Sequence, residues 1–74
     1  MKFKDIKKGD VFRAKEGCGE LITVGRKYKI TFTGFLEQSL TVYAIMNNGD
    51  TVHFDRYLWE YYFYPDKVNK GVLL

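Results

Sequence analysis

The stretch LTVYAIMNNGDTVHF, residues 40–54, decides the fold that the sequence predicts. Two apolar runs flank Asn48-Gly49, and both residues can adopt the positive φ of a type I′ turn, so the stretch predicts a β-hairpin. That turn sets a register in which Asn47 faces Asp50. The face expected to line the core then consists of Tyr43, Ile45, Val52 and Phe54. The opposite face, smaller and more polar, consists of Ala44, Thr51 and His53.

Two further strands are predicted before the hairpin. Tyr28–Thr33 alternates apolar and polar residues with the period of two that a half-buried strand shows. Tyr28, Ile30 and Phe32 are expected to face the core. Val11–Ala14 is the first strand, and a long loop with three glycines joins it to the second.

The aromatic segment after the hairpin allows two interpretations. Residues 55–58 predict a short turn or 3₁₀ segment capped by Asp55, and Glu60–Tyr64 then predicts a last strand that ends at Pro65. The alternative is a two-turn helix over Asp55–Phe63, because apolar residues recur there at helical spacing. The β-propensity of consecutive aromatic residues favours the strand.

Five short strands in this order are typical of an all-β fold, a small five-stranded SH3-like barrel with a short 3₁₀ or helical turn before the last strand. A chain of 74 residues forms one domain and excludes a multidomain enzyme. We expect the domain to occupy residues 1–65. Residues 66–74 are expected to be a loose tail that ends in the apolar Val72-Leu73-Leu74.

Three stretches carry a resemblance to a known family: Lys7–Val11, Leu21–Ile30 and Asn47–Phe54 with the aromatic end after it. In the order and spacing of its strands and turns the chain resembles the small SH3-like barrel proteins that bacteriophages and prophages encode. The resemblance implies a barrel in which Lys8-Gly9-Asp10 turns into the first strand. It also implies a role in redirecting a bacterial host.

Aromatic residues make up 18% of the chain, and seven of the thirteen fall within Phe54–Tyr64. A domain of this size buries only about 60% of its unfolded surface, so some rings are expected at the surface or against a partner. Tyrosine and tryptophan are enriched at interface hot spots. The predicted protein-binding residues are Tyr57, Trp59, Tyr62 and Tyr64. The first functional hypothesis is therefore a phage-type binding protein that contacts and modulates or inhibits a bacterial host protein.

Charge is segregated along the sequence, which supports a second hypothesis. Residues 1–29 carry nine basic and four acidic side chains, whereas residues 30–74 carry three basic and five acidic ones. A basic patch in the first half could bind DNA or RNA, with solvated lysines on an amphipathic strand as the plainer interpretation. The candidate nucleic-acid-binding residues are Lys4, Lys7, Lys8, Arg13, Arg26, Lys27 and Lys29.

Catalysis and cofactor binding have little support in the sequence. Cys18, Ser39 and His53 are the chain's single cysteine, serine and histidine, and they fall on three different predicted elements. Structural zinc needs about four cysteine or histidine ligands and the chain has only two, so we predict a non-enzyme with no metal and no cofactor. Neither a signal peptide nor a membrane span is recognisable, and one cysteine fits a reducing compartment, so we expect a cytoplasmic protein, in the bacterial host if phage-encoded. A monomer and a homodimer both remain open.

Overall fold

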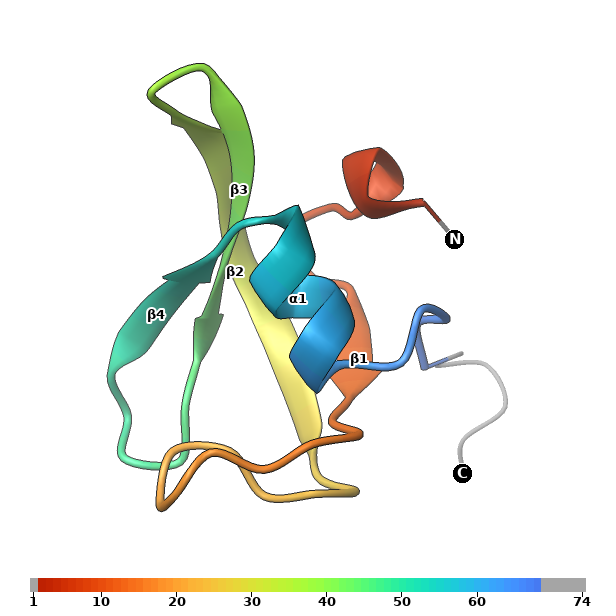
Figure 1. Cartoon of the computed structure of the whole chain (residues 1–74), viewed down its shortest axis with the longest axis vertical. Coiled ribbons are helices and arrows are strands. Elements are labelled where there is room, and N and C mark those ends of the chain that lie inside the picture. The colour runs from red at the N-terminus through yellow and green to blue at the C-terminus, as the bar shows by residue number, and fades with distance from the viewer. Residues whose placement is uncertain (1, 69–74) are drawn as a thin grey trace.

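The chain folds into a four-stranded antiparallel sheet and one short α-helix (Figure 1). The computed structural model describes residues 2–68. The elements, in chain order, are the 3₁₀ helix η1 (Phe3–Asp5), β1 (Val11–Arg13), β2 (Lys27–Leu36), β3 (Ser39–Ile45), β4 (Thr51–Phe54) and α1 (Arg56–Tyr62). The mainly β character predicted from the sequence is confirmed.

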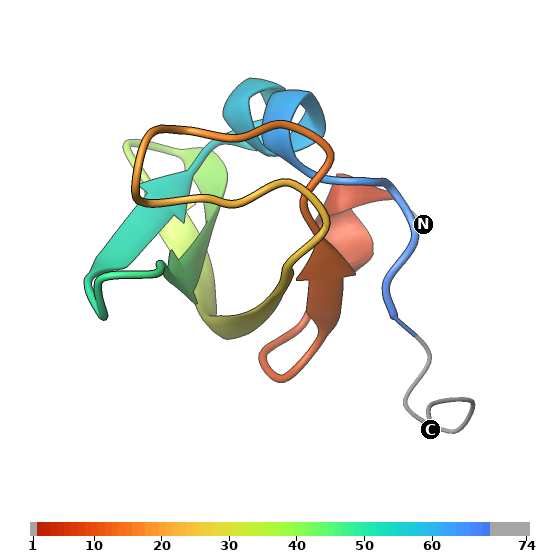
Figure 2. The ribbon, with the colours of Figure 1, turned by 90° about the horizontal axis from the view of Figure 1, so that it is seen from below.

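The strands follow one another in the order β1-β2-β3-β4, and each pairs with the next in an antiparallel direction. Figure 2 shows that the sheet curves and that α1 lies over its concave side. The hydrophobic core fills the space between them. Its largest fully buried side chains are Phe12, Ile30, Val42 and Phe63.

The segment after α1 runs along the free edge of β1. Phe63 forms an antiparallel bridge with Ala14, and the amide of Tyr64 donates to the carbonyl oxygen of Arg13 at 3.1 Å. The amide of Val68 donates to the carbonyl oxygen of Val11 at 2.6 Å. Residues 66–68 of the predicted loose tail are therefore attached to the sheet. The apolar end at residues 72–74 lies outside the described residues.

The predicted last strand at Glu60–Tyr64 is wrong, because this segment is mostly helical. The Asp55 side chain caps α1, as expected, by accepting a hydrogen bond from the amide of Leu58 at 2.8 Å. Helical geometry places Trp59 and Phe63 four residues apart on one face, where their rings stack at 3.9 Å inside the core. Burial of both large rings outweighs the β-propensity of the aromatic run. The five-stranded arrangement is accordingly replaced by four strands and a helix.

The turn of the β3–β4 hairpin differs from the predicted type I′ turn. Only Gly49 has a positive φ, at 90°, and Asn48 does not. The amide of Gly49 donates to the carbonyl oxygen of Met46 at 3.0 Å, and the amide of Met46 donates to the carbonyl oxygen of Asp50 at 2.8 Å. These bonds define a three-residue loop that ends in a left-handed glycine, the second common way to close a hairpin.

The longer loop shifts the register by one residue, so the predicted core face is wrong for β3. Val42 pairs with Phe54, and Ala44 pairs with Val52. Val42, Ala44 and Phe54 are buried, whereas Tyr43 and Ile45 point away from the core. A one-residue slip exchanges every side chain between the two faces.

The alternation predicted for β2 holds only in its first half. Tyr28 and Ile30 are buried as expected, but Phe32 is 58% exposed. A β-bulge lies between Ile30, which pairs with Ala44, and Phe32, which pairs with Tyr43. The extra residue reverses which side chains face inward, so Phe32 lies on the outer, convex face of the sheet.

Replacing Gly49 by valine is expected to lower the free energy of unfolding by roughly 1–2 kcal/mol, because a β-branched residue is strained at positive φ. The destabilisation does not come from a steric clash, since a Cβ at this position has no neighbour within 4 Å. Urea unfolding followed by circular dichroism measures the change. Gly49→Asn is the control, because asparagine tolerates the left-handed conformation. The free energy of unfolding should fall much less in this variant. Equal midpoints for Gly49→Val and the wild type would contradict the turn assignment.

Candidate functional site

The four predicted protein-binding residues do not form one surface. Tyr57 on α1 and Tyr64 after it are 73% and 49% exposed, whereas Trp59 is 3% exposed and belongs to the core. Tyr62 is half-buried and packs against the core from its edge. The helical turn, in place of the predicted strand, points these side chains in different directions.

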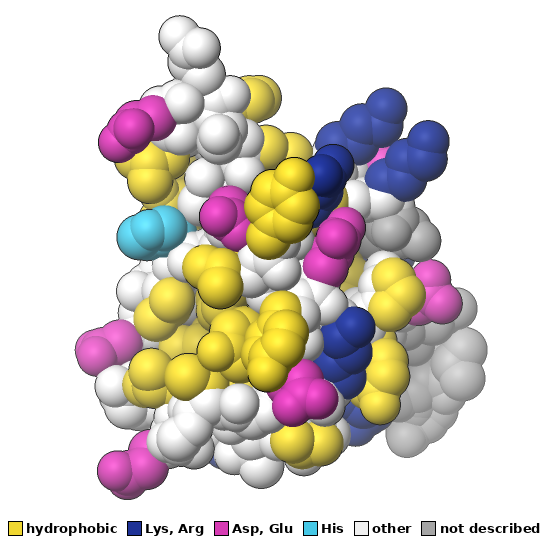
Figure 3. Space-filling view, viewed as in Figure 1, with side chains coloured by type: hydrophobic (Ala, Val, Ile, Leu, Met, Phe, Trp, Pro, Cys, Tyr) yellow, Lys and Arg dark blue, Asp and Glu magenta, His cyan; other side chains and the backbone are white. Residues whose placement is uncertain are grey.

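A continuous apolar area lies across the gap between α1 and β4, as the space-filling view shows (Figure 3). Leu58 and Tyr61 on α1 are 48% and 59% exposed. Four partly buried side chains, from β4, α1 and the loop before β2, pack against the core. Tyr62 lies one helical turn after Leu58, its ring meets that of Tyr61, and its hydroxyl is near the Cys18 thiol. We call this surface the front patch and define it as Cys18, Leu21, Val52, Leu58, Tyr61 and Tyr62.

Tyr62 is the fixed centre of the front patch. Its ring meets that of Tyr61 edge-on at 4.9 Å and that of Phe54 at 6.4 Å. A hydrogen bond with the Cys18 thiol raises the pKa of the Tyr62 hydroxyl, as do the charge of that thiol, burial, and the neighbouring Tyr61 and Glu16. The carbonyl oxygen of Tyr62 ties α1 to the loop, because it accepts from the amides of Lys15 and Glu16 at 2.8 and 3.3 Å. An ordered ring loses little conformational entropy when a partner covers it.

The segment that carries β4 and α1, residues 50–62, has a net negative charge. Asp50, Asp55 and Glu60 are exposed on β4, α1 and their flanks. Arg56 is the one basic residue in residues 50–62, and its guanidinium lies 4.9 Å from the centre of the Tyr57 ring.

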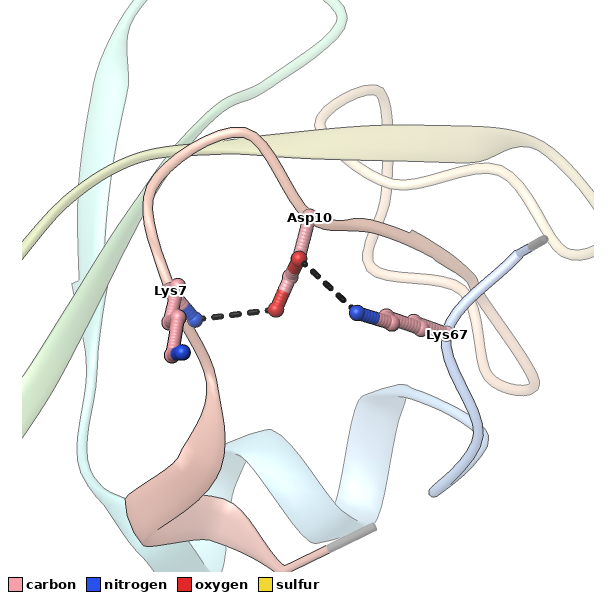
Figure 4. A network of polar contacts seen from close by, with 3 residues as sticks. All are labelled: Lys7, Asp10 and Lys67. Carbon is pink, nitrogen blue, oxygen red and sulfur yellow. Dashed lines mark hydrogen bonds and ion pairs between the residues drawn. The ribbon is translucent and has the colours of Figure 1, made fainter. Parts of the chain in front are cut away.

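The predicted nucleic-acid-binding residues are only partly brought together. Arg13 on β1 lies directly opposite Lys27 on β2, and Lys29 lies two residues further along the same face. Arg26 directly precedes β2, and Lys7 and Lys8 lie in the turn before β1. Lys4 lies on η1, apart from this group. In that turn the Asp10 carboxylate accepts from the amide of Lys7 at 2.9 Å and pairs with the Lys67 ammonium at 3.5 Å (Figure 4).

Ser39, His53 and Cys18, the residue types most often used in nucleophilic catalysis, are not arranged as a catalytic site in residues 2–68. Ser39 and His53 both line an open hollow of about 330 Å³, together with Asp55. Among residues 2–68 no hydrogen bond joins this serine, histidine and carboxylate, and the Asp55 carboxylate is used as the helix cap. Cys18 is elsewhere, in a bridged turn with Ile22. A nucleophile and a base held by a third group are the usual mark of such catalysis.

A larger open hollow of about 660 Å³ lies between η1, the start of β3 and the start of α1. Its lining combines three basic side chains with two acidic ones: Lys2, Lys4, Arg56, Asp55 and Glu60. Phe3, Leu40 and Tyr57 add apolar surface. Charges of both signs line the hollow, so nothing in the lining selects an anion or a cation.

Sequence reasoning missed two sets of exposed residues. Leu58 and Tyr61 belong to the front patch. The helical spacing of Leu58, Tyr61 and Tyr62 would have placed them on one face of a helix, but apolar spacing alone does not show that Trp59 and Phe63 would be buried instead. Phe32 and Tyr43 lie next to each other on the outer face of the sheet, with ring centres 5.5 Å apart. The bulge and the longer hairpin loop, which turn them outward, have no clear signal in the sequence.

Residues 2–68 contain no group of three or more His, Cys, Asp or Glu side chains that could hold a metal ion. Within the same residues no helix is both long and apolar enough to cross a membrane. The chain matches no protein-family model, no curated protein and no solved structure.

Proposed function

We propose that this chain is a non-catalytic binding protein that contacts another protein through the front patch. One observation carries the proposal: residues from three separate segments form one exposed apolar area beside the core. Large contiguous apolar patches on a small monomer mark interaction sites, whereas scattered apolar residues need no explanation.

Composition supports a protein as the partner. Two adjoining tyrosines with an exposed leucine form the kind of rigid, amphipathic centre at which binding energy concentrates. Residues 50–62 carry three acidic side chains and one arginine, and this net negative charge favours a protein whose apolar contact surface has a basic rim.

The same charges argue against a second copy of the chain as the partner. In a two-fold symmetric dimer each patch would meet its own equivalent, so the net negative charge of residues 50–62 would face that of the other subunit. Juxtaposed like charges cost several kcal/mol at an interface. We therefore assign the front patch to a different protein.

The resemblance to phage-encoded barrel proteins suggests where that partner belongs. We propose a bacterial host protein, whose activity is modulated or inhibited when its apolar surface is covered. Binding without chemistry is sufficient for such a role, because occupation of a functional surface blocks it.

The test is capture from a bacterial lysate with a double variant, Leu58→Ser and Tyr61→Ser. Both side chains are exposed, so the variant is expected to fold. Loss of a hot spot worth at least 2 kcal/mol should weaken binding of the captured protein about 30-fold or more, measured by calorimetry with the purified partner.

The matched control is Phe35→Ser with Leu36→Ser, an aromatic residue and a leucine exposed at the far end of the β2–β3 hairpin. This control should bind as the wild type does. Equal loss in both double variants would show non-specific adhesion and contradict the proposal. Sedimentation of the purified chain as a dimer that only the Leu58/Tyr61 variant dissociates would assign the patch to a second copy instead.

A further inference from the structure

A row of three rings crosses the outer face of the sheet. Phe32 on β2 pairs with Tyr43 on β3, which pairs with His53 on β4. The ring centres of Phe32 and Tyr43 are 5.5 Å apart, and those of Tyr43 and His53 are 5.9 Å apart. The solvent face of an antiparallel sheet is normally polar, so a row of rings there is not explained by the core.

Two local features hold Phe32 in this row. The bulge after Ile30 turns its side chain to the outer face. A Cβ at Gly34 would lie 2.9 Å from Cε2 of Phe32, so the lack of a side chain at Gly34 leaves room for the ring against the sheet. Together they keep an exposed ring close to the sheet surface.

The bulge also places Phe32 on the same face as a basic cluster. Arg13 and Lys27 lie directly opposite each other, and Lys29 comes three residues before Phe32 on β2, roughly 10 Å away along the strand. Like charges directly opposite in a sheet are destabilising. A cluster that weakens the fold is expected where a bound anion compensates for it.

The positive charge of this cluster is not neutralised within residues 2–68. Neither Lys27 nor Lys29 forms an ion pair there, and the Arg13 guanidinium donates to the carbonyl oxygen of Gly25 at 2.7 Å. The nearby Asp10 is already engaged by Lys67 and by the amide of Lys7 (Figure 4).

We propose that the outer face of the sheet binds single-stranded nucleic acid. Arg13, Lys27 and Lys29 would hold the phosphates while bases stack on Phe32 and Tyr43. Stacking on an exposed sheet together with a basic track is how single strands are bound without sequence preference. A duplex keeps its bases stacked on each other, so its bases cannot stack on Phe32 and Tyr43. Contact with a lipid membrane would not require the rings to form a row.

The experiment measures binding of a fluorescein-labelled 12-nucleotide oligo-dT by anisotropy in low salt. Phe32→Ala should weaken binding about 5- to 150-fold, the effect of removing one stacking platform. Phe35→Ala is the matched control, because Phe35 is an exposed ring of the same strand outside the row, and it should bind as the wild type does.

The charge arm compares Lys27→Gln with Lys2→Gln, an exposed lysine near η1. Lys27→Gln should lower the slope of log affinity against log salt by about 0.7, and Lys2→Gln should leave it unchanged. Thermal unfolding of each variant confirms that it is folded. Equal effects of the two lysines, no effect of Phe32→Ala, or duplex bound as tightly as the single strand would each overturn the proposal. Because none of these residues belongs to the front patch, failure here leaves the proposed protein contact untouched.

Discussion

Replacing Trp59 by alanine is expected to lower the free energy of unfolding by about 3–5 kcal/mol, the usual effect of deleting a buried large aromatic side chain. A chain of 74 residues is typically stable by roughly 4–11 kcal/mol, so this substitution removes from about a quarter to all of the free energy of unfolding. Trp59 stacks on Phe63 at 3.9 Å and meets Phe12 and Phe54 edge-on at 5.1 and 5.5 Å. Its removal opens a cavity at the contact between α1 and the sheet.

The matched control is Tyr57→Ala, on the same helix but 73% exposed. It should change the free energy of unfolding by less than about 0.5 kcal/mol. Urea unfolding followed by far-UV circular dichroism compares the two, since the variant has no tryptophan for fluorescence. A wild-type midpoint for Trp59→Ala would contradict the packing of α1. Loss of binding in this variant would reflect unfolding and says nothing about a contact made by Trp59.

Replacing Asn47 by alanine is expected to lower the free energy of unfolding by about 2–3 kcal/mol, because three side-chain hydrogen bonds are lost at a half-buried site. Its Oδ1 accepts from the Tyr28 hydroxyl at 2.7 Å. Its Nδ2 donates to the Glu20 carbonyl oxygen at 3.0 Å and to Oγ1 of Thr23 at 2.9 Å. One side chain thus joins the β3–β4 turn to the loop before β2.

Asn48→Ala is the control, since within residues 2–68 the Asn48 side chain bonds only with Asp50 inside the turn. We expect a loss of less than about 1 kcal/mol for it. Hydrogen exchange adds a local measurement. The amide of Thr23 donates to the Tyr28 hydroxyl at 2.8 Å, so it should exchange faster in Asn47→Ala and not in Asn48→Ala. Equal stability losses for the two asparagines would contradict the assigned network.

Local sequence signals predicted the parts of the fold that depend on neighbours in the chain. The strand at Val11, the alternation from Tyr28 to Ile30, the hairpin and the Asp55 cap are all confirmed. Each follows from a turn residue, a periodicity or a cap within a few positions. The exact register did not follow, because a glycine with positive φ suits both a two-residue and a three-residue loop.

The errors concern features that only the tertiary structure determines. Trp59 and Phe63 reach the core as a helical pair, although their neighbours favour a strand. Phe32 is turned outward by a β-bulge that the local sequence does not predict. The partners of Asn47 lie 19 to 27 residues away in sequence. The front patch was missed for the same reason, since only Tyr62 of its six residues was predicted to bind.

The most direct test of the proposed protein contact is site-specific photo-crosslinking in bacterial cells. Benzoylphenylalanine would replace Tyr61 in the front patch or, as the control, the more exposed Phe35 at the end of the β2–β3 hairpin. We predict that position 61 crosslinks to one bacterial protein and that position 35 does not. Crosslinks to that protein from position 35 alone, or none from position 61 to any protein, would contradict the account.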